Sequence, residues 1–474
     1  MVAKGVDFYI YSDSDTDRTE INGPKFTAGP YGREVNFRRS NLQISSARIP
    51  GAGSYTGTLK CTVRRRNAVL MHQFQDINSL YGSMRDRGTM SNIFKTPPRL
   101  GDPTICWGYY HAGDGLLSPL TNQSQFHVYV TRNQNRWMTD LAARDPRIAR
   151  GPFARFALPG AHDAGMYDMG AVNGILADPK LALVMIGVVA LMPIIGAIIV
   201  GLARPLIPVA IANLAMTQKD DITTMLEIGT RYFDFRPGHM HPKVRHYAPG
   251  ALFHQHGAIP GISYAGFLRM VLTWLDANPG EIVVVDLNTQ GFADASMKPT
   301  REQLDRHLKG SIGAANLSRP IAIGDTQSLS LAYEELVRTN TRLIFIDRMD
   351  GQTNAHDSWL GIAYATLEPE PVINAFKAMG GPMPPGKDFT VMQMQATSTA
   401  MGAGVIVPAI RRATWASSVL MATKAVMDAG TIPWLRENAA KTVPPDHLLV
   451  LLNDFIDNCT VETAAMLTRQ RARD

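Results

Sequence analysis

From about residue 150 onward, short apolar segments alternate with stretches that have the spacing of helices, and this alternation restricts the possible folds more than any other feature. The helical stretches include DDITTMLEIG, YAGFLRMVLTWLDANPG and SLAYEELVRTN. Strands separated by helical crossovers pair in parallel, so the pattern predicts an α/β fold with a (β/α)8 barrel of the TIM type, regular or distorted. The expected strands are 153–158, 231–236, 252–256, 281–288, 342–348, 362–367, 390–396 and 448–455.

Residues 1–145 have a different polarity pattern, which predicts a separate β-rich domain. The runs VDFYIYS, EVNFRRSNLQISSARI, GTLKCTVRRR and FHVYVTR alternate in polarity or are rich in β-branched residues, as strands are. A chain of 474 residues fits two domains. We therefore expect a β-rich domain over 1–145 and a barrel over 146–474.

The excess of basic residues is concentrated at the N-terminal end. Residues 1–150 contain 20 Lys and Arg against 12 Asp and Glu, a balance of +8, whereas the whole chain has 47 against 41, a balance of +6. A basic domain beside a nearly neutral one suits an anionic partner, and we expect a phospholipid membrane surface rather than nucleic acid. A basic domain that is merely soluble is the alternative.

One apolar segment interrupts this pattern. The stretch LALVMIGVVALMPIIGAIIVGLA, residues 181–203, has no charged residue, and the apolar character resumes after Arg204 up to residue 216. The segment is long enough to cross a bilayer, but Pro193 and Gly196 favour a kink or a hairpin of two short helices. Three structures stay open for this insertion of about 170–216: a buried helix pair, a hairpin that enters the membrane and a true span.

Cysteine usage and the first residues bear on the compartment. Cys61, Cys106 and Cys459 are far apart and form no CxxC or Cys/His pattern, which favours a reducing compartment over a disulfide framework or a zinc ribbon. The start MVAKGVDFYIYSDSDTD lacks the apolar core of a classical signal peptide. We therefore expect a cytoplasmic protein that associates peripherally with membranes.

Polar residues end most of the expected barrel strands. Such residues are rare inside barrel strands, and the carboxyl ends of parallel strands meet on one rim, where the catalytic residues of barrel enzymes lie. Two histidines, several carboxylates and an arginine suit phosphoryl chemistry, because one histidine can remove a proton, the other can supply one and arginine can offset charge on phosphate. The residues are His162, Asp163, Asp234, Arg236, His254, His256, Asp286, Asn288, Asp347, Arg348, Asn453 and Asp454.

These motifs, in this order, resemble the catalytic barrel of the bacterial-type phosphatidylinositol-specific phospholipases C. The resemblance rests on LPGAHDAG, TQKDDITTMLEIGTRYFDFRPG, FHQHG, NPGEIVVVDLN and LLVLLNDFID, and it covers about 150–460 without the apolar insertion. It implies a phosphoric diester hydrolase or lyase that needs no cofactor and whose first products are a cyclic phosphate and diacylglycerol.

The resemblance also implies roles for the two histidines and their partners. His162 corresponds to the general base, and Asp454 corresponds to the carboxylate that orients it. His256 corresponds to the general acid, and Asp163 corresponds to its carboxylate partner.

A second group of residues is expected around the phosphate and the head group. Arg236 matches the arginine that binds the phosphate, with Asp234 beside it on the same strand face, although a purely structural ion pair is the alternative. Asn288, Arg348 and His254 are expected to bind substrate, His254 with packing as the alternative. Relatives place a lysine after the fourth strand, where this chain has DLNTQG, so the phosphodiester chemistry is better supported than the head group.

The same positions indicate whether the site binds a metal ion. In calcium-dependent animal relatives the residue after the first histidine is Asn, and further carboxylates hold the ion, whereas this chain has Asp163 and Arg236. A guanidinium can supply positive charge without a coordination site, which implies a site without metal. The histidine-rich stretch 239–256 suggests zinc as an alternative but lacks a clear ligand set. Rival functions are a glycerophosphodiesterase, a sphingomyelinase-D-like enzyme and a non-catalytic lipid-binding protein.

Overall fold

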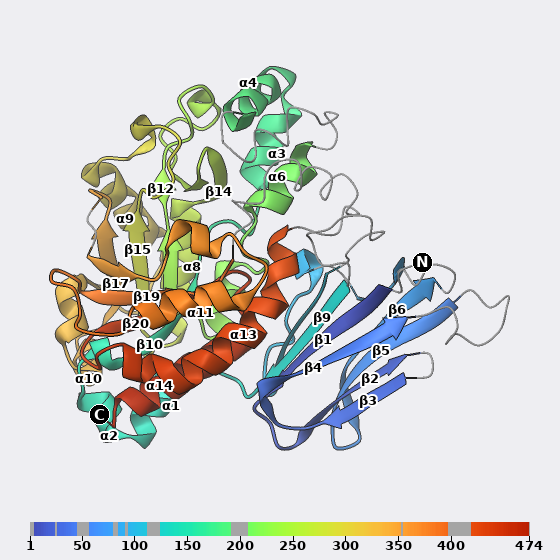
Figure 1. Ribbon diagram of the computed structural model, residues 1–474. Helices are drawn as coiled ribbons and strands as arrows, with labels where there is room; N and C mark the ends of the chain where they lie inside the picture. Colours follow the sequence, from blue (N-terminus) through green and yellow to red (C-terminus); the bar gives the residue numbers. More distant parts are fainter. Residues whose placement is uncertain are drawn as a thin grey trace.

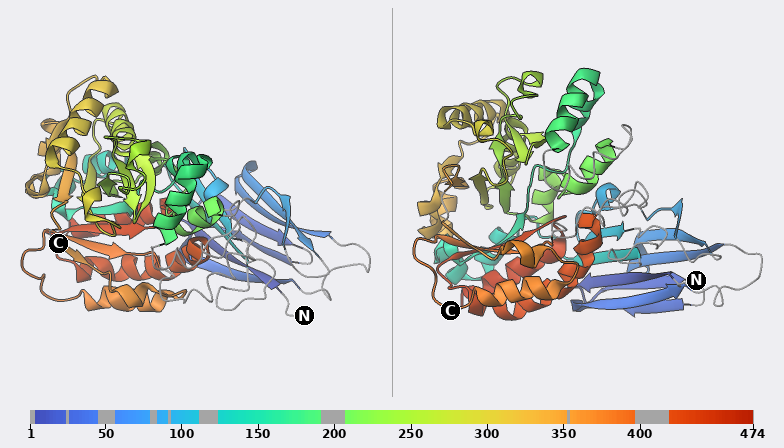
Figure 2. Two further views of the ribbon diagram at one scale, coloured as in Figure 1. Left: turned by 90° about the horizontal axis from the view of Figure 1, so that it is seen from above. Right: turned by 45° about the horizontal axis from the view of Figure 1, so that its top comes forward.

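The computed structural model describes residues 4–23, 26–44, 56–78, 84–90, 93–110, 124–190, 207–351, 354–396 and 419–473. Figures 1 and 2 show two parts that lie side by side. One part consists of N-terminal sheets, and the other is a mixed α/β body that contains the C-terminus.

The N-terminal part is a pair of β-sheets, as the alternating runs predict. The first has the order β4-β1-β9-β8 and the second the order β3-β2-β5-β6-β7. Apolar side chains of both sheets, such as Phe8, Ile10, Cys61 and Val63, form one buried core between them. The strands are β1 (Lys4–Ser12), β2 (Asp17–Gly23), β3 (Phe26–Tyr31), β4 (Glu34–Ile44), β5 (Thr56–Arg65), β6 (Ala68–Asn78), β7 (Met84–Gly88), β8 (Thr104–Tyr110) and β9 (Ser124–Thr131).

The second part is built on a curled eight-stranded sheet with the order β16-β17-β15-β11-β10-β20-β19-β18. Every neighbouring pair in it is parallel. Within the described chain β16 and β18 do not pair, so the sheet is a barrel that stays open at this point, and the TIM-like prediction holds only in this coarser form. The strands are β10 (Ala157–Ala161), β11 (Tyr232–Phe235), β15 (Val283–Asn288), β16 (Ala322–Gly324), β17 (Thr341–Arg348), β18 (Ala355–Asp357), β19 (Phe389–Gln393) and β20 (Leu448–Asn453).

Two of the expected barrel strands are wrong. Residues 252–256 form β13 (Phe253–His256), which pairs antiparallel with β12 (Pro237–Gly238) and β14 (Ile259–Ser263) outside the barrel. The reason is Gly257, whose φ of 67° allows the tight turn that folds β13 back onto β14. Residues 362–367 are also not a strand, since Gly361–Tyr364 is a 3₁₀ turn.

Helices cover the outside of the curled sheet and explain its stability. The helix α8, for example, buries Phe267, Val271 and Leu275 at helical spacing, and each full burial of this kind contributes about 1.5–3 kcal/mol. The helix α14 packs against β10 on one side and against β9 of the N-terminal sheet on the other. The helices are α1 (Trp137–Arg144), α2 (Pro146–Arg150), α7 (Ile222–Ile228), α8 (Tyr264–Ala277), α9 (Arg301–Ala315), α10 (Tyr333–Arg338), α11 (Pro369–Ala378), α13 (Val419–Thr442) and α14 (Asn458–Arg471).

The apolar insertion follows β10 and forms a small helical group beside β14 (Figure 1). Its helices α3 (Gly170–Ala177), α4 (Pro179–Ala190) and α6 (Ile207–Ala215) bury one apolar face each in a shared cluster. Among the described residues, no helix combines the length and apolar character needed to cross a bilayer. Residues 191–206, where the kink or hairpin was expected, lie outside the described chain.

Candidate active site

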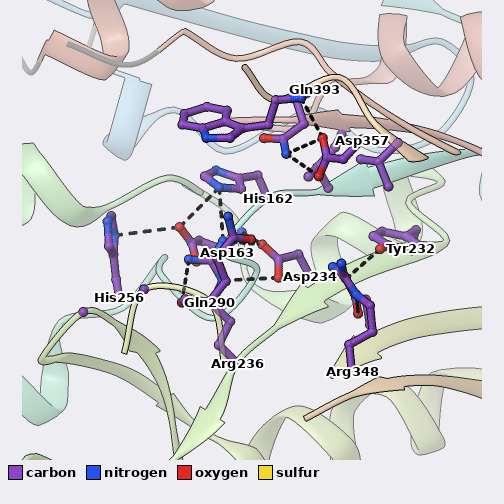
Figure 3. Close-up of a pocket in the computed structure, with 16 residues that line it drawn as sticks. His162, Asp163, Tyr232, Asp234, Arg236, His256, Gln290, Arg348, Asp357 and Gln393 are labelled. Carbon is purple, nitrogen blue, oxygen red and sulfur yellow. Dashed lines mark hydrogen bonds and ion pairs between the residues drawn. The ribbon is translucent and has the colours of Figure 1, made fainter. Parts of the chain in front are cut away.

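A cavity of about 320 Å³ opens where the carboxyl ends of several barrel strands meet (Figure 3). This is the end of the sheet at which barrel enzymes place their catalytic groups. The lining residues are His162, Asp163, Tyr232, Asp234, Arg236, His256, Gly257, Asp286, Gln290, Gly291, Arg348, Asp357, Trp359, Val391, Gln393 and Leu452.

His162 and Asp454 form a short hydrogen-bonded pair at the cavity wall. His162 follows β10, Asp454 follows β20, and these two strands are direct neighbours in the sheet. The distance from His162 Nδ1 to Asp454 Oδ1 is 2.7 Å, so Nδ1–H donates to the carboxylate. The other ring nitrogen, Nε2, therefore faces the residues of the cavity and can accept a proton there.

The backbone after β10 is shaped to place this imidazole. His162 N donates to Asn453 O at 3.1 Å, which locks the two strand ends together. Asp163 has a left-handed backbone with φ of 43°. A Cβ at Gly165 would lie 2.3 Å from the Cβ of His254, so only glycine allows this loop to pack so closely. The second glycine of LPGAHDAG is thus required by close packing.

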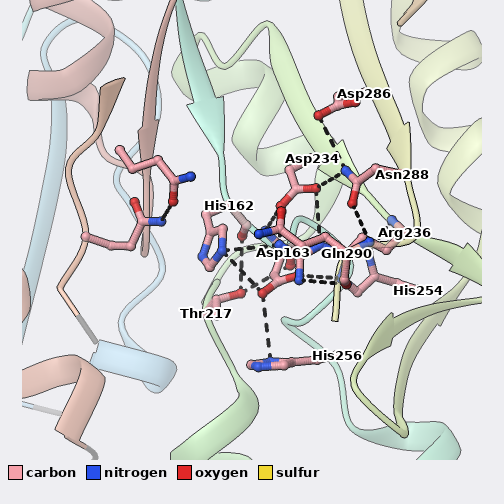
Figure 4. Close-up of polar contacts among 12 residues, drawn as sticks. His162, Asp163, Thr217, Asp234, Arg236, His254, His256, Asp286, Asn288 and Gln290 are labelled. Atoms are coloured by element: carbon pink, nitrogen blue, oxygen red, sulfur yellow. Dashed lines mark hydrogen bonds and ion pairs between the residues drawn. The ribbon is translucent and has the colours of Figure 1, made fainter. Parts of the chain in front are cut away.

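Asp163 is a hub that touches four other side chains (Figure 4). Its Oδ1 lies 2.9 Å from Arg236 Nη1 and 3.1 Å from His254 Nε2. Its Oδ2 lies 3.4 Å from His162 Nε2 and 3.9 Å from His256 Nδ1. Burial raises the pKa of Asp163, but the Arg236 charge, together with the contacts to the three histidines, outweighs it and holds that pKa well below its usual range, so the carboxylate stays ionised.

The position of His256 corrects one detail of the expected arrangement. Its Nδ1 lies closer to the backbone oxygen of Ala215, at 3.3 Å, than to Asp163, which is too far for a hydrogen bond. Ala215 ends α6, so the apolar insertion directly contacts one of the two cavity histidines. The Asp163 carboxylate acts on His256 as a nearby charge rather than as a hydrogen-bond partner.

Arg236 lies between two buried carboxylates at the cavity floor. Its Nε and Nη2 donate to Asp234 at 3.3 and 2.8 Å, and its Nη1 pairs with Asp163. Burial disfavours its charge, but the two carboxylates raise the pKa of Arg236, so it is a fixed cation. Its Nη2 lies 3.4 Å from His162 Nε2, which places the positive charge beside the nitrogen that can accept a proton.

The same carboxylates bear on metal binding. His162, Asp163 and Asp234 place potential ligand atoms within 4.8 Å of one another, a grouping that could hold a cation. The Arg236 guanidinium already contacts both carboxylates, so a cation could bind there only if this side chain moved away.

Not all of the expected substrate-binding residues reach the cavity. His254 is completely buried and accepts a hydrogen bond from Arg236 N at 3.2 Å, so it packs behind Asp163, in agreement with the packing alternative, and does not line the cavity. Asn288 is buried as well and donates to Asp234 Oδ1 at 2.8 Å. Arg348 does line the cavity, where it forms a bidentate ion pair with Asp286.

Asp347 and Asn453 also point away from the cavity lining. Asp347 pairs with Arg301 at the start of α9. Asn453 is buried and donates to Asp428 at 2.8 Å. Alternate residues of a strand face opposite sides, which is why the residue beside a lining position is absent from the wall.

Several lining residues were not expected from the sequence, and four of them are Tyr232, Asp357, Trp359 and Gln393. Gln393 donates to both carboxylate oxygens of Asp357 at 2.9 Å, and Trp359 lies beside them on the cavity wall. Burial raises the pKa of Asp357. Tyr232 donates to Asp286 at 2.9 Å. Of these, Tyr232 alone carried a signal, because it precedes Asp234 by two positions and therefore shares its strand face.

The comparisons with known proteins concern the fold. No family model and no curated protein matches the chain. Among solved structures, it is similar to the phosphatidylinositol-specific phospholipase C of Listeria monocytogenes at 14% identity, covering 71% of this chain and 98% of that one with a TM-score of 0.38. A fluorinated variant of the Staphylococcus aureus enzyme gives 15% identity, 70% and 97% coverage and a TM-score of 0.41.

The charges around His162 lead to a prediction about pH. Burial lowers the pKa of this imidazole, but Asp163 and Asp454 outweigh it and raise the pKa from 6.5 to about 9. We therefore expect the imidazole of His162 to lose its proton near pH 9 rather than near 6.5. Asp454→Asn removes one of these charges and should move this titration to lower pH. An NMR pH titration of the imidazole in both proteins measures this, and a shift to higher pH in the variant would contradict it.

Proposed function

We propose that this protein is a phospholipase C-like phosphodiesterase that cleaves the head group from a glycerophospholipid such as phosphatidylinositol. One observation supports this most strongly: His162, fixed by Asp454 at 2.7 Å, and His256 line one cavity together with the Arg236 guanidinium. This is the set of groups needed to move two protons and offset the charge of a phosphate.

The proposed reaction uses a hydroxyl of the substrate itself as the nucleophile. Nε2 of His162 removes the proton from the head-group hydroxyl next to the phosphodiester, and the resulting oxygen attacks phosphorus. Arg236 pairs with the non-bridging oxygens and offsets the charge that develops on them. His256 gives a proton to the leaving oxygen of diacylglycerol as its bond to phosphorus breaks. The products are diacylglycerol and a cyclic phosphate of the head group, and no other reactant is consumed.

Further residues of the cavity lining favour a head group with several hydroxyls. Asp357 and Gln393 offer acceptors and donors for hydroxyl groups, and the flat face of Trp359 suits the C–H face of a ring. Arg348 and Asp286 add a further donor and acceptor to the lining. An inositol ring has both the ring face and the hydroxyls that these groups would satisfy.

The proposal is tested by identifying the product. Purified protein is incubated with vesicles of phosphatidylinositol, phosphatidylcholine, phosphatidylethanolamine or phosphatidylserine, with and without EDTA, and the released compounds are identified by mass spectrometry. We expect diacylglycerol and inositol cyclic phosphate in both conditions. Release of phosphatidic acid, or activity that EDTA abolishes and a divalent ion restores, would instead support one of the rival phosphodiesterases. No product from any lipid would favour a lipid-binding protein.

We further propose that the apolar insertion contacts the lipid surface beside the cavity. Its helix α4 has no charged residue after Lys180, and Leu183 is 68% exposed although its neighbours Met185 and Val189 are buried. An outward-facing leucine on an apolar helix next to a phosphodiesterase cavity suits contact with acyl chains. The contact of Ala215 with His256 would connect lipid binding to the site.

Leu183→Asp is expected to weaken binding to phosphatidylinositol vesicles, because an exposed leucine that enters lipid contributes roughly 1.5–3 kcal/mol, or about 10- to 100-fold in affinity. Turnover of a soluble phosphodiester analogue should not change. Leu331→Asp is the matched control, since Leu331 is 39% exposed and its carbonyl accepts from Phe153 at the opposite end of the sheet. Vesicle sedimentation measures both variants; equal binding by Leu183→Asp and wild type would exclude this surface.

A further inference from the structure

A group of buried charged residues joins the N-terminal sheets to the barrel. Lys424, on α13, lies 3.0 Å from Asp428 Oδ2 and 3.5 Å from Asp457 Oδ2. The two carboxylates are completely buried, and the lysine is 3% exposed. Burying a charged lysine is costly unless it makes specific contacts, so its contacts indicate what it stabilises.

Lys424 holds the segment that carries the carboxylate partner of His162. Its Nζ donates to the backbone oxygen of Asp454 at 3.1 Å. Asp428, which pairs with the lysine, accepts a hydrogen bond from the Asn453 side chain at 2.8 Å. Phe455 follows with a left-handed backbone, φ of 47°, a conformation that a residue other than glycine keeps only when its surroundings hold it.

The N-terminal sheet takes part in the same network through β9. Tyr129 donates its hydroxyl hydrogen to Asp428 Oδ2 at 3.1 Å. The Asn458 side chain, just beyond the same segment, donates to the Tyr129 carbonyl and to Thr131 Oγ1, both at 3.1 Å. His127 Nε2 lies 3.6 Å from Asp457. Tyr129 of the N-terminal sheet is thus connected to Asp454 through only two intervening residues, Asp428 and Lys424.

The charge states of Lys424 and His127 do not change near neutral pH. Burial disfavours the charged form of Lys424, but Asp428 and Asp457 outweigh it and raise the pKa of the lysine. Burial, followed by the Lys424 charge, lowers the pKa of His127 to about 3, so this imidazole is neutral. The lysine is therefore a permanent cation in a fixed place, which suits a positioning role.

We propose that Lys424 and Tyr129 are positioning residues of the active centre, and that the N-terminal sheet thereby sets the orientation of the His162–Asp454 pair. Lys424 fixes the backbone of Asp454, and Tyr129 fixes the carboxylate that holds Lys424 and Asn453. The inference rests on the proposed function, because turnover is how the orientation is measured. It gives the N-terminal part a role in positioning the active centre that does not require this part to bind lipid.

Tyr129→Phe tests this with a matched control on the neighbouring strand. Tyr11 of β1 is in register with Tyr129, is also completely buried, and donates its hydroxyl hydrogen to Glu462 at 2.9 Å at the same interface. Both changes remove one buried hydroxyl and should lower Tm by a similar amount. We expect Tyr129→Phe to lower kcat on the order of tenfold at unchanged KM, because small displacements of a catalytic group are costly, and Tyr11→Phe to leave kcat unchanged.

A double-mutant cycle shows whether the effect passes through Asp454. In an Asp454→Ala background, Tyr129→Phe should have no further effect on kcat. Lys424→Met should lower kcat more than Tyr129→Phe does. This variant can also impair folding, because it removes the cation that pairs with two buried carboxylates. The comparison of Tyr129→Phe with Tyr11→Phe is therefore the deciding test. Equal kcat values for wild type and Tyr129→Phe, or equal losses in both tyrosine variants, would overturn this inference alone. Wild-type protein inactive on every phosphodiester would overturn the proposed function with it.

Discussion

His162→Ala and His256→Ala are each expected to lower kcat by about 10²–10⁴-fold, the range that general acid–base catalysis contributes per group. His162 would act as the base through Nε2, and without it the head-group hydroxyl keeps its proton and attacks phosphorus poorly. His256 would act as the acid, and without it the diacylglycerol oxygen leaves as an alkoxide. The two losses should not add fully in the double variant, because the groups act in one transition state.

The fold should survive these changes, which makes the kinetic result interpretable. The side chains of His162 and His256 are 15% and 28% exposed, so neither substitution opens a large void in the core. His246→Ala is the control, since His246 is exposed and does not line the cavity. Steady-state kinetics and thermal unfolding of the three variants separate catalysis from stability. Near-normal turnover in either cavity variant would remove that histidine from the mechanism.

The residues that meet in the cavity could be predicted because strand geometry is local. Asp234 and Arg236 are two positions apart at the end of one strand, so the period of two places them on the same face. His162 and Asp454 are 292 positions apart in the chain, but each follows a barrel strand, and the rule that the carboxyl ends meet on one rim brings them together. These predictions need only the strand ends, not the full packing.

What could not be predicted depends on packing between distant segments. The strand β18 has three residues, too few for a polarity pattern, so Asp357 carried no signal as a lining residue. His254 and His256 are two positions apart in β13. The sequence could not show that this strand lies outside the barrel or that His254 is buried behind Asp163. Lys424 has the sequence context of an ordinary helix residue, and only the tertiary structure reveals its contact with Asp454.

Arg236→Lys is expected to lower kcat/KM by about 10²–10³-fold, the loss seen when one donor to a developing negative charge is removed. Lysine keeps the positive charge but has a single ammonium group in place of the planar guanidinium. It therefore cannot pair with Asp163 and Asp234 and also donate two hydrogen bonds to phosphate. The displaced carboxylates should in turn disturb His162, because Asp163 lies 3.4 Å from its Nε2.

Arg231→Lys is the matched control for this prediction. Arg231 immediately precedes the same strand, β11, and is a completely buried arginine whose Nε and Nη2 lie 2.9 and 2.8 Å from Glu281, at the end of the sheet away from the cavity. Both substitutions break the geometry of a buried ion pair and should lower Tm, since an imperfectly paired buried carboxylate is costly. Only Arg236→Lys should lower kcat/KM at a temperature where both proteins are folded. If the two variants lose equal activity, Arg236 is a structural ion pair, and another group of the cavity must offset the charge of the phosphate. Arg348 is the other arginine among the lining residues.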